Sequence, residues 1–281
     1  MPATLTEPSP PRFAFGENWS RFLRTVTEDR IAAATQSLRN VLGDDLHGKR
    51  FLDIGCGSGL FSLAAHRLGA EVVSFDFDVD SVACAEELRR REGAAPERWR
   101  IERGSVLDAD YLAGLDEFDV VYAWGVLHHT GAMWTAIDLA SQRVGPAGVL
   151  WIAVYNDQGV WSRMWRVVKR CYVSLPAWLR PAYVVVVGGT WAAQRAVRLV
   201  LRRLTERVLV REQPHPVASH QRARGMHLWY DLVDWIGGYP FEVAKPEDVF
   251  RFVRDRGFSL VELNTCGGGL GCNEFVFRRN R

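Results

Sequence analysis

Short apolar runs alternate with longer amphipathic segments through residues 50–155 of the chain. The apolar runs are rich in Val, Ile, Leu and Phe, which is typical of strands buried on both faces. The segments between them carry apolar residues at helical spacing. We therefore expect strands at Arg50–Ile54, Glu71–Phe75, Arg100–Arg103, Phe118–Trp124 and Gly148–Tyr155, and helices at Leu60–Leu68, Ser81–Arg91 and Met133–Val144.

Such an alternation predicts βαβ units and a parallel sheet covered on both faces. The regular pattern stops at Asn156 and returns with a helix expected at Pro246–Arg256 and strands expected at Phe258–Leu263 and Glu274–Arg278. The sequence NTCGGGLGCN between the last two strands is short enough for a hairpin but not for a crossover. The predicted fold class is therefore α/β, a Rossmann-like doubly wound sheet that is mostly parallel, with an antiparallel C-terminal hairpin strand and a helical insertion.

The same pattern divides the chain into three parts. Residues 1–45 begin with a Pro-rich leader and continue with apolar residues at helical spacing over Asn18–Leu42. Residues 46–156 and 246–281 form the predicted core. Residues 157–245, rich in Arg and Trp, form a predicted basic helical insertion.

Composition places the chain among soluble globular proteins, since 48% of its 281 residues are hydrophobic and 24% are charged. The N-terminal sequence MPATLTEPSPPRF lacks the features of a secretion signal or an anchor, and no apolar run reaches the ~20 residues of a spanning helix. Five scattered cysteines indicate a reducing compartment, so we expect a cytoplasmic protein. Cys266 and Cys272 lie close together, but no His or further Cys beside them completes a zinc-ligand pattern, and we predict no metal site.

Net charge is uneven along the chain. The total is only +2, whereas residues 156–224 contain thirteen Lys or Arg and three Asp or Glu, a net of +10 that leaves −8 for the rest. Arg195, Arg198, Arg202 and Arg203 alternate with apolar residues as on an amphipathic basic helix. Three interpretations stay open: a solvated helix face, attraction of an acidic or lipid-linked substrate with the helix in a membrane interface, and nucleic-acid binding, which no recognised RNA module supports.

A glycine-rich turn follows the first predicted strand. In FLDIGCGSG, Asp53 precedes Gly55, Gly57 and Gly59, which alternate with other residues just before a predicted helix. Glycines there permit positive φ and let the backbone approach a ligand closely. The spacing GxGxG differs from the GxGxxG of dinucleotide-binding turns, and the turn lacks the Lys and Ser/Thr of a triphosphate-binding loop.

The next two strand ends carry groups suited to a nucleoside. Asp76 ends the second predicted strand, 23 residues after Asp53, where a carboxylate binds both hydroxyls of a ribose and repels a 2′-phosphate. Ser105 and Val106 follow the third strand, where they offer a polar group and an apolar wall to an adenine.

Taken in order, LDIGCGSG, the acid in FDFD, RGSVLD and WGVLHHTG resemble the class I S-adenosylmethionine-dependent methyltransferases, particularly the group similar to ubiquinone-biosynthesis methyltransferases. The resemblance covers about Lys49–Tyr155 and Pro246–Arg278, and the C-terminal hairpin agrees with the reversed final strand of that fold. It implies S-adenosylmethionine as the cofactor. The cofactor-binding residues that it implies are Asp53, Gly55, Cys56, Gly57, Gly59, Asp76, Phe77, Ser105, Val106, Trp124 and Trp19, with Gly125 as an alternative to Trp124 at the sulfonium. Many relatives have Asp at the position of Ser105, which leaves the adenine contact to the backbone as an alternative.

Methyl transfer to oxygen or nitrogen also calls for removal of a proton, so we expect a general base near the end of the fourth strand. His128 is the first candidate for the base, with packing in a helix as its alternative. In the family a His at this position often bonds backbone near the methionine group, so His129 is expected to serve as scaffold or to contact substrate.

The insertion is expected to cap the acceptor site, because it combines aromatic, acidic and glycine residues. Its candidates are His227, Asp231 and Tyr239 for catalysis, and Tyr155, Asn156 and Glu242 for substrate contact, each with a structural role as the alternative. The N-terminal FAFGENWSRF resembles the lid of several such enzymes, in which Phe15, Asn18 and Trp19 would cover the methionine end; a hydrophobic staple before a helix is the alternative. Residues 1–45 are therefore expected to form a leader and a helical lid.

These residues predict an S-adenosylmethionine-dependent methyltransferase that acts on an oxygen, nitrogen or carbon of a small-molecule or lipid-like substrate. Two alternatives stay open. A Rossmann-type oxidoreductase is disfavoured by the GxGxG spacing and the terminal hairpin, and a non-catalytic cofactor-binding partner subunit would keep the same motifs. The acceptor, the pathway and the oligomeric state do not follow from the sequence.

Overall fold

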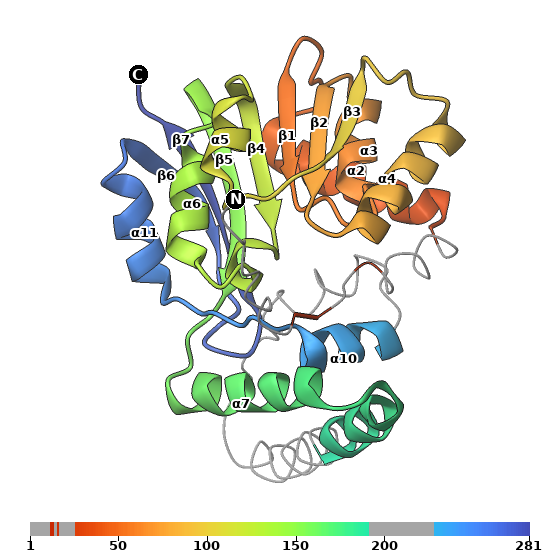
Figure 1. Cartoon of the computed structure of the whole chain (residues 1–281). Coiled ribbons are helices and arrows are strands. Elements are labelled where there is room, and N and C mark those ends of the chain that lie inside the picture. Colours follow the sequence, from red (N-terminus) through yellow and green to blue (C-terminus); the bar gives the residue numbers. More distant parts are fainter. Residues whose placement is uncertain (1–11, 14–15, 17–25, 191–227) are drawn as a thin grey trace, which may run out of the picture.

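A seven-stranded sheet with the order β3-β2-β1-β4-β5-β7-β6 runs through the computed structural model (Figure 1), which describes residues 12–13, 16, 26–190 and 228–281. Strands β1 to β5 are parallel, and β7 pairs antiparallel with both β5 and β6. The predicted fold class, including the antiparallel hairpin, is confirmed. The strand bounds are β1 Arg50–Ile54, β2 Glu71–Asp76, β3 Trp99–Arg103, β4 Phe118–Trp124, β5 Val144–Tyr155, β6 Phe258–Asn264 and β7 Cys272–Arg279.

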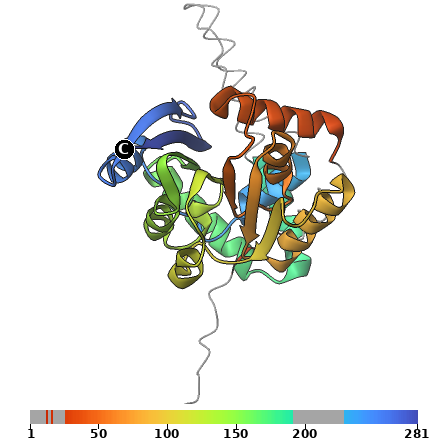
Figure 2. The ribbon, with the colours of Figure 1, turned by 90° about the horizontal axis from the view of Figure 1, so that it is seen from above.

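Helices cover both faces of this sheet, as the view from above shows (Figure 2). One face carries α2 (Glu28–Leu42), α3 (Leu60–Arg67) and α4 (Val79–Glu92). The other carries α5 (Ala109–Ala113), α6 (Met133–Ser141) and α11 (Pro246–Arg254). The short helix α5 is a strand connection that the apolar pattern does not predict, and the side chain of Asp108 caps it by accepting from Tyr111 N.

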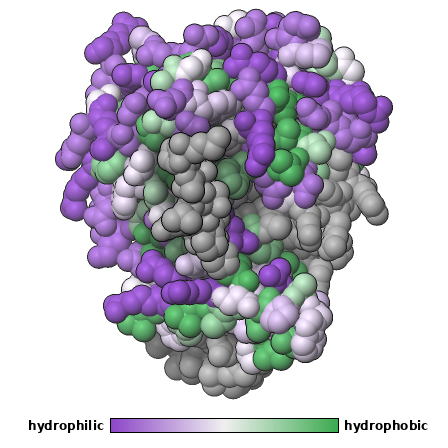
Figure 3. Space-filling model, in the orientation of Figure 1, coloured by the Kyte–Doolittle hydropathy of each residue, from purple (hydrophilic) through white to green (hydrophobic). Residues whose placement is uncertain are grey.

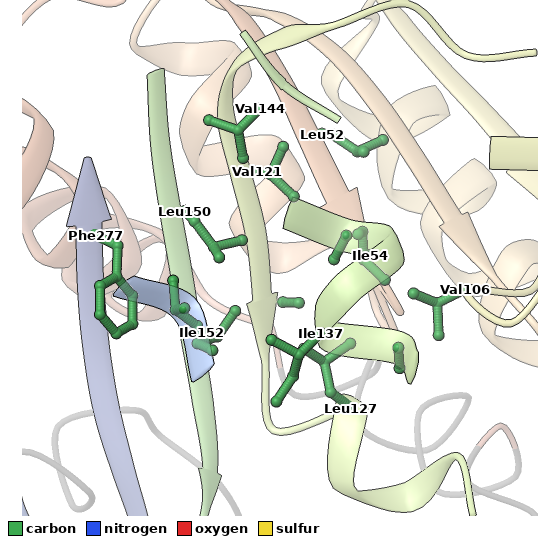
Figure 4. Packing of buried hydrophobic residues seen from close by; sticks show 14 of the residues in the cluster. Leu52, Ile54, Val106, Val121, Leu127, Ile137, Val144, Leu150, Ile152 and Phe277 are labelled. Carbon is green, nitrogen blue, oxygen red and sulfur yellow. The ribbon is translucent and has the colours of Figure 1, made fainter. Parts of the chain in front are cut away.

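Alternation along the strands divides the core into two clusters. Successive residues of a strand point to opposite faces, so Val120 and Tyr122 join the cluster under α2–α4, whereas Val121 joins the cluster under α5, α6 and α11. The cluster under α5, α6 and α11 includes Leu52, Val121 and Leu150 of the strands together with Ile137 of α6 (Figure 4). The parallel strands therefore read as unbroken apolar runs because both of their faces are buried.

β5 begins at Val144, four residues earlier than its apolar run predicts. Val144, expected to end the preceding helix, instead pairs with Phe118 and is fully buried. The register then shifts between Phe118 and Val120, and Ala147 within this stretch has φ 58°. The sequence Gly-Pro-Ala-Gly at residues 145–148 makes this part of the strand irregular, and the same residue types are typical of loops, which is why the pattern does not predict a strand here.

Helix α2 belongs to the core layer, although the sequence pattern groups it with an N-terminal lid. Its Ile31, Ala34 and Leu38 are buried in the cluster under α2–α4. Arg67 of α3 pairs with Glu28 at the start of α2, with Nη1 2.6 Å from Oε2. Burial of this apolar stripe explains the helical spacing that the sequence shows at these positions.

A third cluster lies beyond the carboxyl ends of the strands (Figure 1). Its residues come mainly from α7 (Val160–Ser174), a helix over residues 180–190 and α10 (Leu228–Gly237), and the short helix η3 (Ala177–Leu179) lies between the first two in the chain. The chain leaves the sheet after β5 and returns beside it, because Asn156 and Ala244 form a parallel bridge. We call residues 157–190 and 228–245 the helical cap; the predicted basic helix at residues 195–203 lies outside the described residues.

Candidate active site

The glycine turn after β1 is tied to the neighbouring strand β2 by its backbone. The N–H groups of Gly55 and Cys56 both donate to the carbonyl of Phe75, at 2.8 and 3.1 Å. Gly55 has φ 68°, and a Cβ built on it would lie 2.4 Å from Cγ1 of Val126. Only glycine fits this position, because both the backbone conformation and the close approach exclude a side chain.

Asp76 joins the same turn to the start of α4. Its Oδ2 accepts from Gly57 N at 3.0 Å, and its Oδ1 accepts from Asp78 N at 2.9 Å. Each carboxylate oxygen has lone pairs for a second donor, so these bonds orient the group without saturating it. Burial raises the pKa of Asp76 to about 6, although the two backbone donors lower it.

Asp53 lies one strand away and is buried, with 3% of its surface exposed. Ser62 Oγ of α3 donates to Asp53 Oδ2 at 2.5 Å, Ser74 Oγ donates to Ser62 Oγ at 2.9 Å, and Trp99 Nε1 donates to Ser74 Oγ at 2.7 Å. Burial raises the pKa of Asp53 to about 7, and the nearby charge of Asp76 raises it further against the bond from Ser62. The sequence analysis missed this chain of donors; its signal is the serine within the otherwise apolar start of α3, LFSLAA.

The predicted adenine side of the site is only partly open. Phe77 follows Asp76 with 55% of its surface exposed, and the guanidinium of Arg12 lies 5.2 Å from its ring centroid. Ser105 Oγ accepts from Leu107 N at 3.2 Å. Val106 packs into the core cluster (Figure 4) and is 6% exposed, so it presents little of the apolar wall that was expected of it.

The turn between the two carboxylates carries Cys56, whose thiol is not activated. Burial raises its pKa well above the ordinary value, and the charges of Asp53 and Asp76 act in the same direction. The group is therefore a neutral thiol at neutral pH, and a packing role follows.

β4 ends at Trp124 and Gly125, next to the glycine turn. Gly125 has φ 77°, and a Cβ built there would meet no atom of the described residues within 4 Å, so none of them crowds this position. Trp124 packs against the cluster under α2–α4. A ligand group at the end of β4 would therefore lie against the backbone of Gly125 and close to Trp124.

Two adjacent histidines follow in the short helix η2 (Leu127–His129). His128 is fully buried, and its pKa is lowered well below the usual value by burial and by the charges of His129 and Lys169. His129 lies 2.7 Å through Nδ1 from the Pro240 carbonyl, which assigns the proton to Nδ1. Burial and the charge of Lys169 lower the pKa of His129 to about 3, so both rings are neutral at neutral pH.

Lys169 of α7 is the functional candidate that the sequence analysis missed. Its side chain is fully buried, and its ammonium donates to the Trp235 carbonyl while lying 4.7, 4.8 and 5.6 Å from the ring centroids of Trp235, Phe241 and Tyr155. Aromatic faces stabilise such a cation through their π electrons. The signal in the sequence is its spacing from Trp165 and Tyr172, which places it on the buried face of α7.

Tyr155 connects this lysine to the histidines, since its ring centroid lies 4.0 Å from that of His128 and 5.4 Å from that of His129. Tyr239 belongs to the same apolar cluster, and its carbonyl accepts from Phe13 N at 3.0 Å. The structure thus brings together Tyr155, Tyr239, His128 and His129 at one end of the sheet. Whether they contact a substrate stays a prediction.

Two other predicted substrate residues have structural partners instead. Glu242 Oε2 accepts from Met133 N at 3.0 Å, which caps the start of α6. Asn156 joins β5 to the terminal hairpin, since its Oδ1 accepts from Asn273 Nδ2 at 3.0 Å and its Nδ2 donates to the Gly269 carbonyl at 3.3 Å. These bonds give both side chains a structural role, and the predicted contact with a substrate stays a prediction.

The remaining candidates cannot be assigned contacts. Phe15, Asn18, Trp19 and His227 lie outside the described residues, and Asp231 lies in α10 with its side chain outside them. No group of three or more His, Cys, Asp or Glu within the described part of the chain could hold a metal ion.

A short N-terminal stretch crosses the carboxyl edge of the sheet. Arg12 donates to the Thr130 carbonyl at 3.0 Å, after η2, and Gly16 N donates to Asp78 Oδ2 at 3.0 Å, after β2. Arg12 therefore lies beside the residues that follow β4, and Gly16 lies beside the start of α4, close to Asp76.

Residues 52–150 match a family model described as a methyltransferase domain, about a third of the chain. A ubiquinone biosynthesis O-methyltransferase from Azorhizobium caulinodans is 32% identical over 136 residues, which are 48% of this chain and 49% of that protein. Another from Rhizobium rhizogenes is 33% identical over 112 residues, 40% of this chain and 43% of that protein. The chain thus spans about half or less of the length of the curated relatives it matches.

Solved structures share the fold at low sequence identity. An O-methyltransferase family protein from Burkholderia thailandensis aligns with a TM-score of 0.56 at 13% identity, over 95% of this chain and 60% of that one. Magnesium protoporphyrin IX methyltransferase from Synechocystis PCC 6803, solved with bound SAH, aligns with a TM-score of 0.52 at 14% identity, over 94% of each chain.

Replacing Asp53 by Asn should stabilise the fold at high pH. The folded chain holds the proton of Asp53 more tightly than the unfolded chain, so the stability contributed by protonated Asp53 is complete below about pH 4 and is lost as pH rises to about 7. The difference between about 7 and the ordinary 3.8 corresponds to about 4 kcal/mol. Urea unfolding should show Asp53→Asn to be more stable than the wild type at pH 8, with a gain that shrinks towards pH 4. The exposed Asp110→Asn serves as control, and an equal gain at both pH values would contradict the assignment.

Replacing Lys169 by Met should raise the pKa of His129, because the charge that opposes its protonation is removed while the side-chain volume is kept. The variant also leaves the Trp235 carbonyl without this donor, which should cost about 1–3 kcal/mol of stability. Histidine resonances followed by NMR during an acid titration test the first effect, with the exposed Arg170→Met as control. An unchanged His129 titration would show that Lys169 does not act on this ring.

Proposed function

We propose that this chain, which contains a class I S-adenosylmethionine-dependent methyltransferase domain, transfers a methyl group from S-adenosylmethionine, the cofactor of that family, to an oxygen, nitrogen or carbon atom of a small or lipid-like acceptor. The observation that carries the proposal is the pairing of Asp76 with the glycine turn. The Asp76 carboxylate accepts from Gly57 N, and the glycines of the turn have no side chains that would keep a ligand from its backbone.

The residues at the sheet edge fit this cofactor. Asp76 keeps acceptor capacity on both oxygens for the two hydroxyls of a ribose. The exposed ring of Phe77 next to it offers an apolar face to an adenine. Gly125, which none of the described residues crowds, lies at the end of β4, beside the turn, and Asp53 provides a buried acid for the amino group of the methionine part.

When bound, S-adenosylmethionine supplies a methyl carbon made electrophilic by its sulfonium. An in-line displacement at that carbon needs little more from a protein than alignment and exclusion of water. Asp76 and the glycine turn fix the nucleoside, while Gly125 and Trp124 bound the end of β4 where the acceptor has to approach. The helical cap lies over the same edge, and its Phe241 and Tyr239 form an apolar wall together with Tyr155 at the end of β5.

Positioning rather than a histidine base accounts for the transfer in this proposal, and an oxygen or nitrogen acceptor loses its proton to solvent before or after the displacement. His128, expected to be the base, is fully buried and its pKa is lowered well below the usual value, so it is a weak proton acceptor that an external group does not reach. His129 already engages the Pro240 carbonyl and has a pKa of about 3. Together with Tyr155 and Lys169, the pair forms a packed support for the acceptor side of the site.

The alternative activities receive less support. The matching family model is a methyltransferase domain, and the curated relatives reported above are O-methyltransferases. A non-catalytic partner subunit would bind the cofactor and form no methylated product. Titration with a reduced nicotinamide cofactor, followed by fluorescence, separates the first alternative, and the labelling experiment below separates the second.

Asp76→Asn should weaken binding of S-adenosylhomocysteine by about 10- to 100-fold, because hydrogen bonds to a charged acceptor contribute about 1.5–3 kcal/mol. Calorimetry measures the affinity, and Asp110→Asn, an exposed acid in α5, is the matched control. Wild-type affinity should also fall as pH is lowered through about 6, where Asp76 takes up its proton, and this dependence should be absent from Asp76→Asn. Equal affinity of wild type and Asp76→Asn would remove the ribose assignment.

The transfer itself is tested with methyl-labelled S-adenosylmethionine and extract fractions. Wild-type protein should transfer the label to a low-molecular-weight or solvent-extractable product. The amount of label transferred by Asp76→Asn should be at least about tenfold lower. Label that stays in the cofactor in every fraction, despite wild-type binding of S-adenosylhomocysteine, would favour the non-catalytic alternative.

A further inference from the structure

The outer face of α7 is apolar although nothing within the described residues covers it. The inner face of α7 packs on α10 through Trp165, Lys169 and Tyr172. On the opposite side, Val160, Met164 and Val167 recur at helical spacing and are exposed, and 62% of the surface of Val167 is accessible. Helix α7 therefore has apolar residues on two sides, and only one side serves the fold.

The neighbouring elements continue this apolar surface. Trp178 in η3 is 77% exposed, and Val185 and Val186 are exposed on the helix over residues 180–190. That helix packs beside α7, since Tyr183 Oη donates to the Val168 carbonyl at 3.0 Å and the rings of Tyr172 and Tyr183 lie 6.2 Å apart. Figure 1 places both helices at the lower end of the molecule, and Figure 3 shows apolar residues gathered there. We call this surface the apolar end of the cap: Val160, Trp161, Met164, Val167, Trp178, Val185 and Val186.

This concentration distinguishes the cap from the rest of the surface. Seven of the thirteen large apolar side chains that are exposed among the described residues belong to the apolar end of the cap. Single exposed apolar residues are ordinary, whereas a contiguous group marks a surface that meets another apolar phase or partner.

The charged residues of the segment that carries the apolar end of the cap, residues 158–190, are all basic. No Asp or Glu occurs between Asp157 and Glu206, whereas Arg163 and Arg170 flank the apolar stripe of α7 and are exposed. Long basic side chains can keep their charge in water while their stems lie along apolar surface. The arrangement of apolar, Trp and Arg residues is that of a helix lying in the interfacial plane of a bilayer.

We propose that the apolar end of the cap binds the surface of a membrane that contains anionic lipid. Val167, Trp178 and Val185 enter the boundary between head groups and acyl chains, and Arg163 and Arg170 pair with lipid phosphates. No helix of the described residues is long and apolar enough to cross a bilayer, so the contact is peripheral. The proposal does not depend on the methyl transfer proposed above.

Charge disfavours the other occupants of this surface. A second copy of the chain would set basic residues against basic residues, and the segment 191–227 of the chain itself is also strongly basic. Nucleic acid would satisfy the arginines but would leave the valines and tryptophans against a polar backbone. An anionic bilayer satisfies both kinds of side chain at once.

Vesicle flotation of the full chain tests the proposal with two lipid compositions, phosphatidylcholine alone and phosphatidylcholine with phosphatidylglycerol. We expect about tenfold more protein to float with the anionic vesicles, and 0.5 M salt to reduce this excess. The double variant Val167→Glu/Trp178→Glu should lose flotation while keeping wild-type affinity for S-adenosylhomocysteine. Its matched control is Val261→Glu, because Val261 is 57% exposed on the edge strand β6 and lies outside the cap.

Three outcomes would overturn the proposal. The first is flotation of the double variant equal to that of the wild type, and the second is loss of flotation in Val261→Glu to the same degree. The third is that the wild type floats with neither kind of vesicle but retains RNA or forms dimers. Loss of that RNA retention or dimer formation in the double variant would then assign the surface to the other partner. Failure of the methyl-transfer assay alone leaves this proposal standing, since flotation is read without cofactor or acceptor.

Discussion

The hydrogen bonds between the turn after β1 and the end of β2 are the constraint on which the site depends. Gly55 and Cys56 donate to the Phe75 carbonyl, and Gly57 donates to Asp76, so three consecutive links fix the turn against the neighbouring strand. These links require a chain that bends without side chains at the glycines, and the register of β1 with β2 sets where the bend falls. The same links orient the Asp76 carboxylate, to which we assign the ribose of the cofactor. In this proposal, one piece of backbone at the junction of two parallel strands determines both the local structure and the binding of the nucleoside.

Two ionisable side chains, Asp53 and Lys169, are buried near this junction, where removal from water disfavours their charged forms. Asp53 is buried at the end of a serine and tryptophan chain, and its raised pKa shows that its charged form is disfavoured there. Lys169 is buried on the other side among aromatic rings and a carbonyl. Buried groups of this kind persist when they have partners, and they are concentrated here at the carboxyl edge of the sheet rather than spread through the core. The position of these two buried ionisable groups is a second indication that the functional site lies at this edge of the sheet.

The sequence predicts the fold well because most strands and helices of the core are specified locally, the short helix α5 and the irregular start of β5 being the exceptions. Apolar runs give the strands, helical spacing gives α3, α4 and α6, and the glycine turn gives the edge at which the ligand groups meet. The roles of the polar side chains in and next to the cap do not follow from the local sequence. Glu242 and Asn156 have the residue types of a site, yet one caps α6 and the other holds the terminal hairpin, because their partners lie more than a hundred positions away. Lys169 is missed for the opposite reason: a lysine in a basic segment suggests a solvated face, and only the packing of α7 on α10 reveals a buried cation.

The bridge between Asn156 and Ala244 gives the cap a common entrance and exit, since the carbonyl of Tyr155 accepts from Ala244 N at 3.0 Å. Two chain ends that lie side by side allow the segment between them to change in length at little entropic cost. The segment between these two anchor points can therefore diverge while the junction of β1 and β2 stays the same. If the chain is the methyltransferase proposed above, a foreign segment grafted between Asn156 and Ala244 is the natural means of directing it to another acceptor.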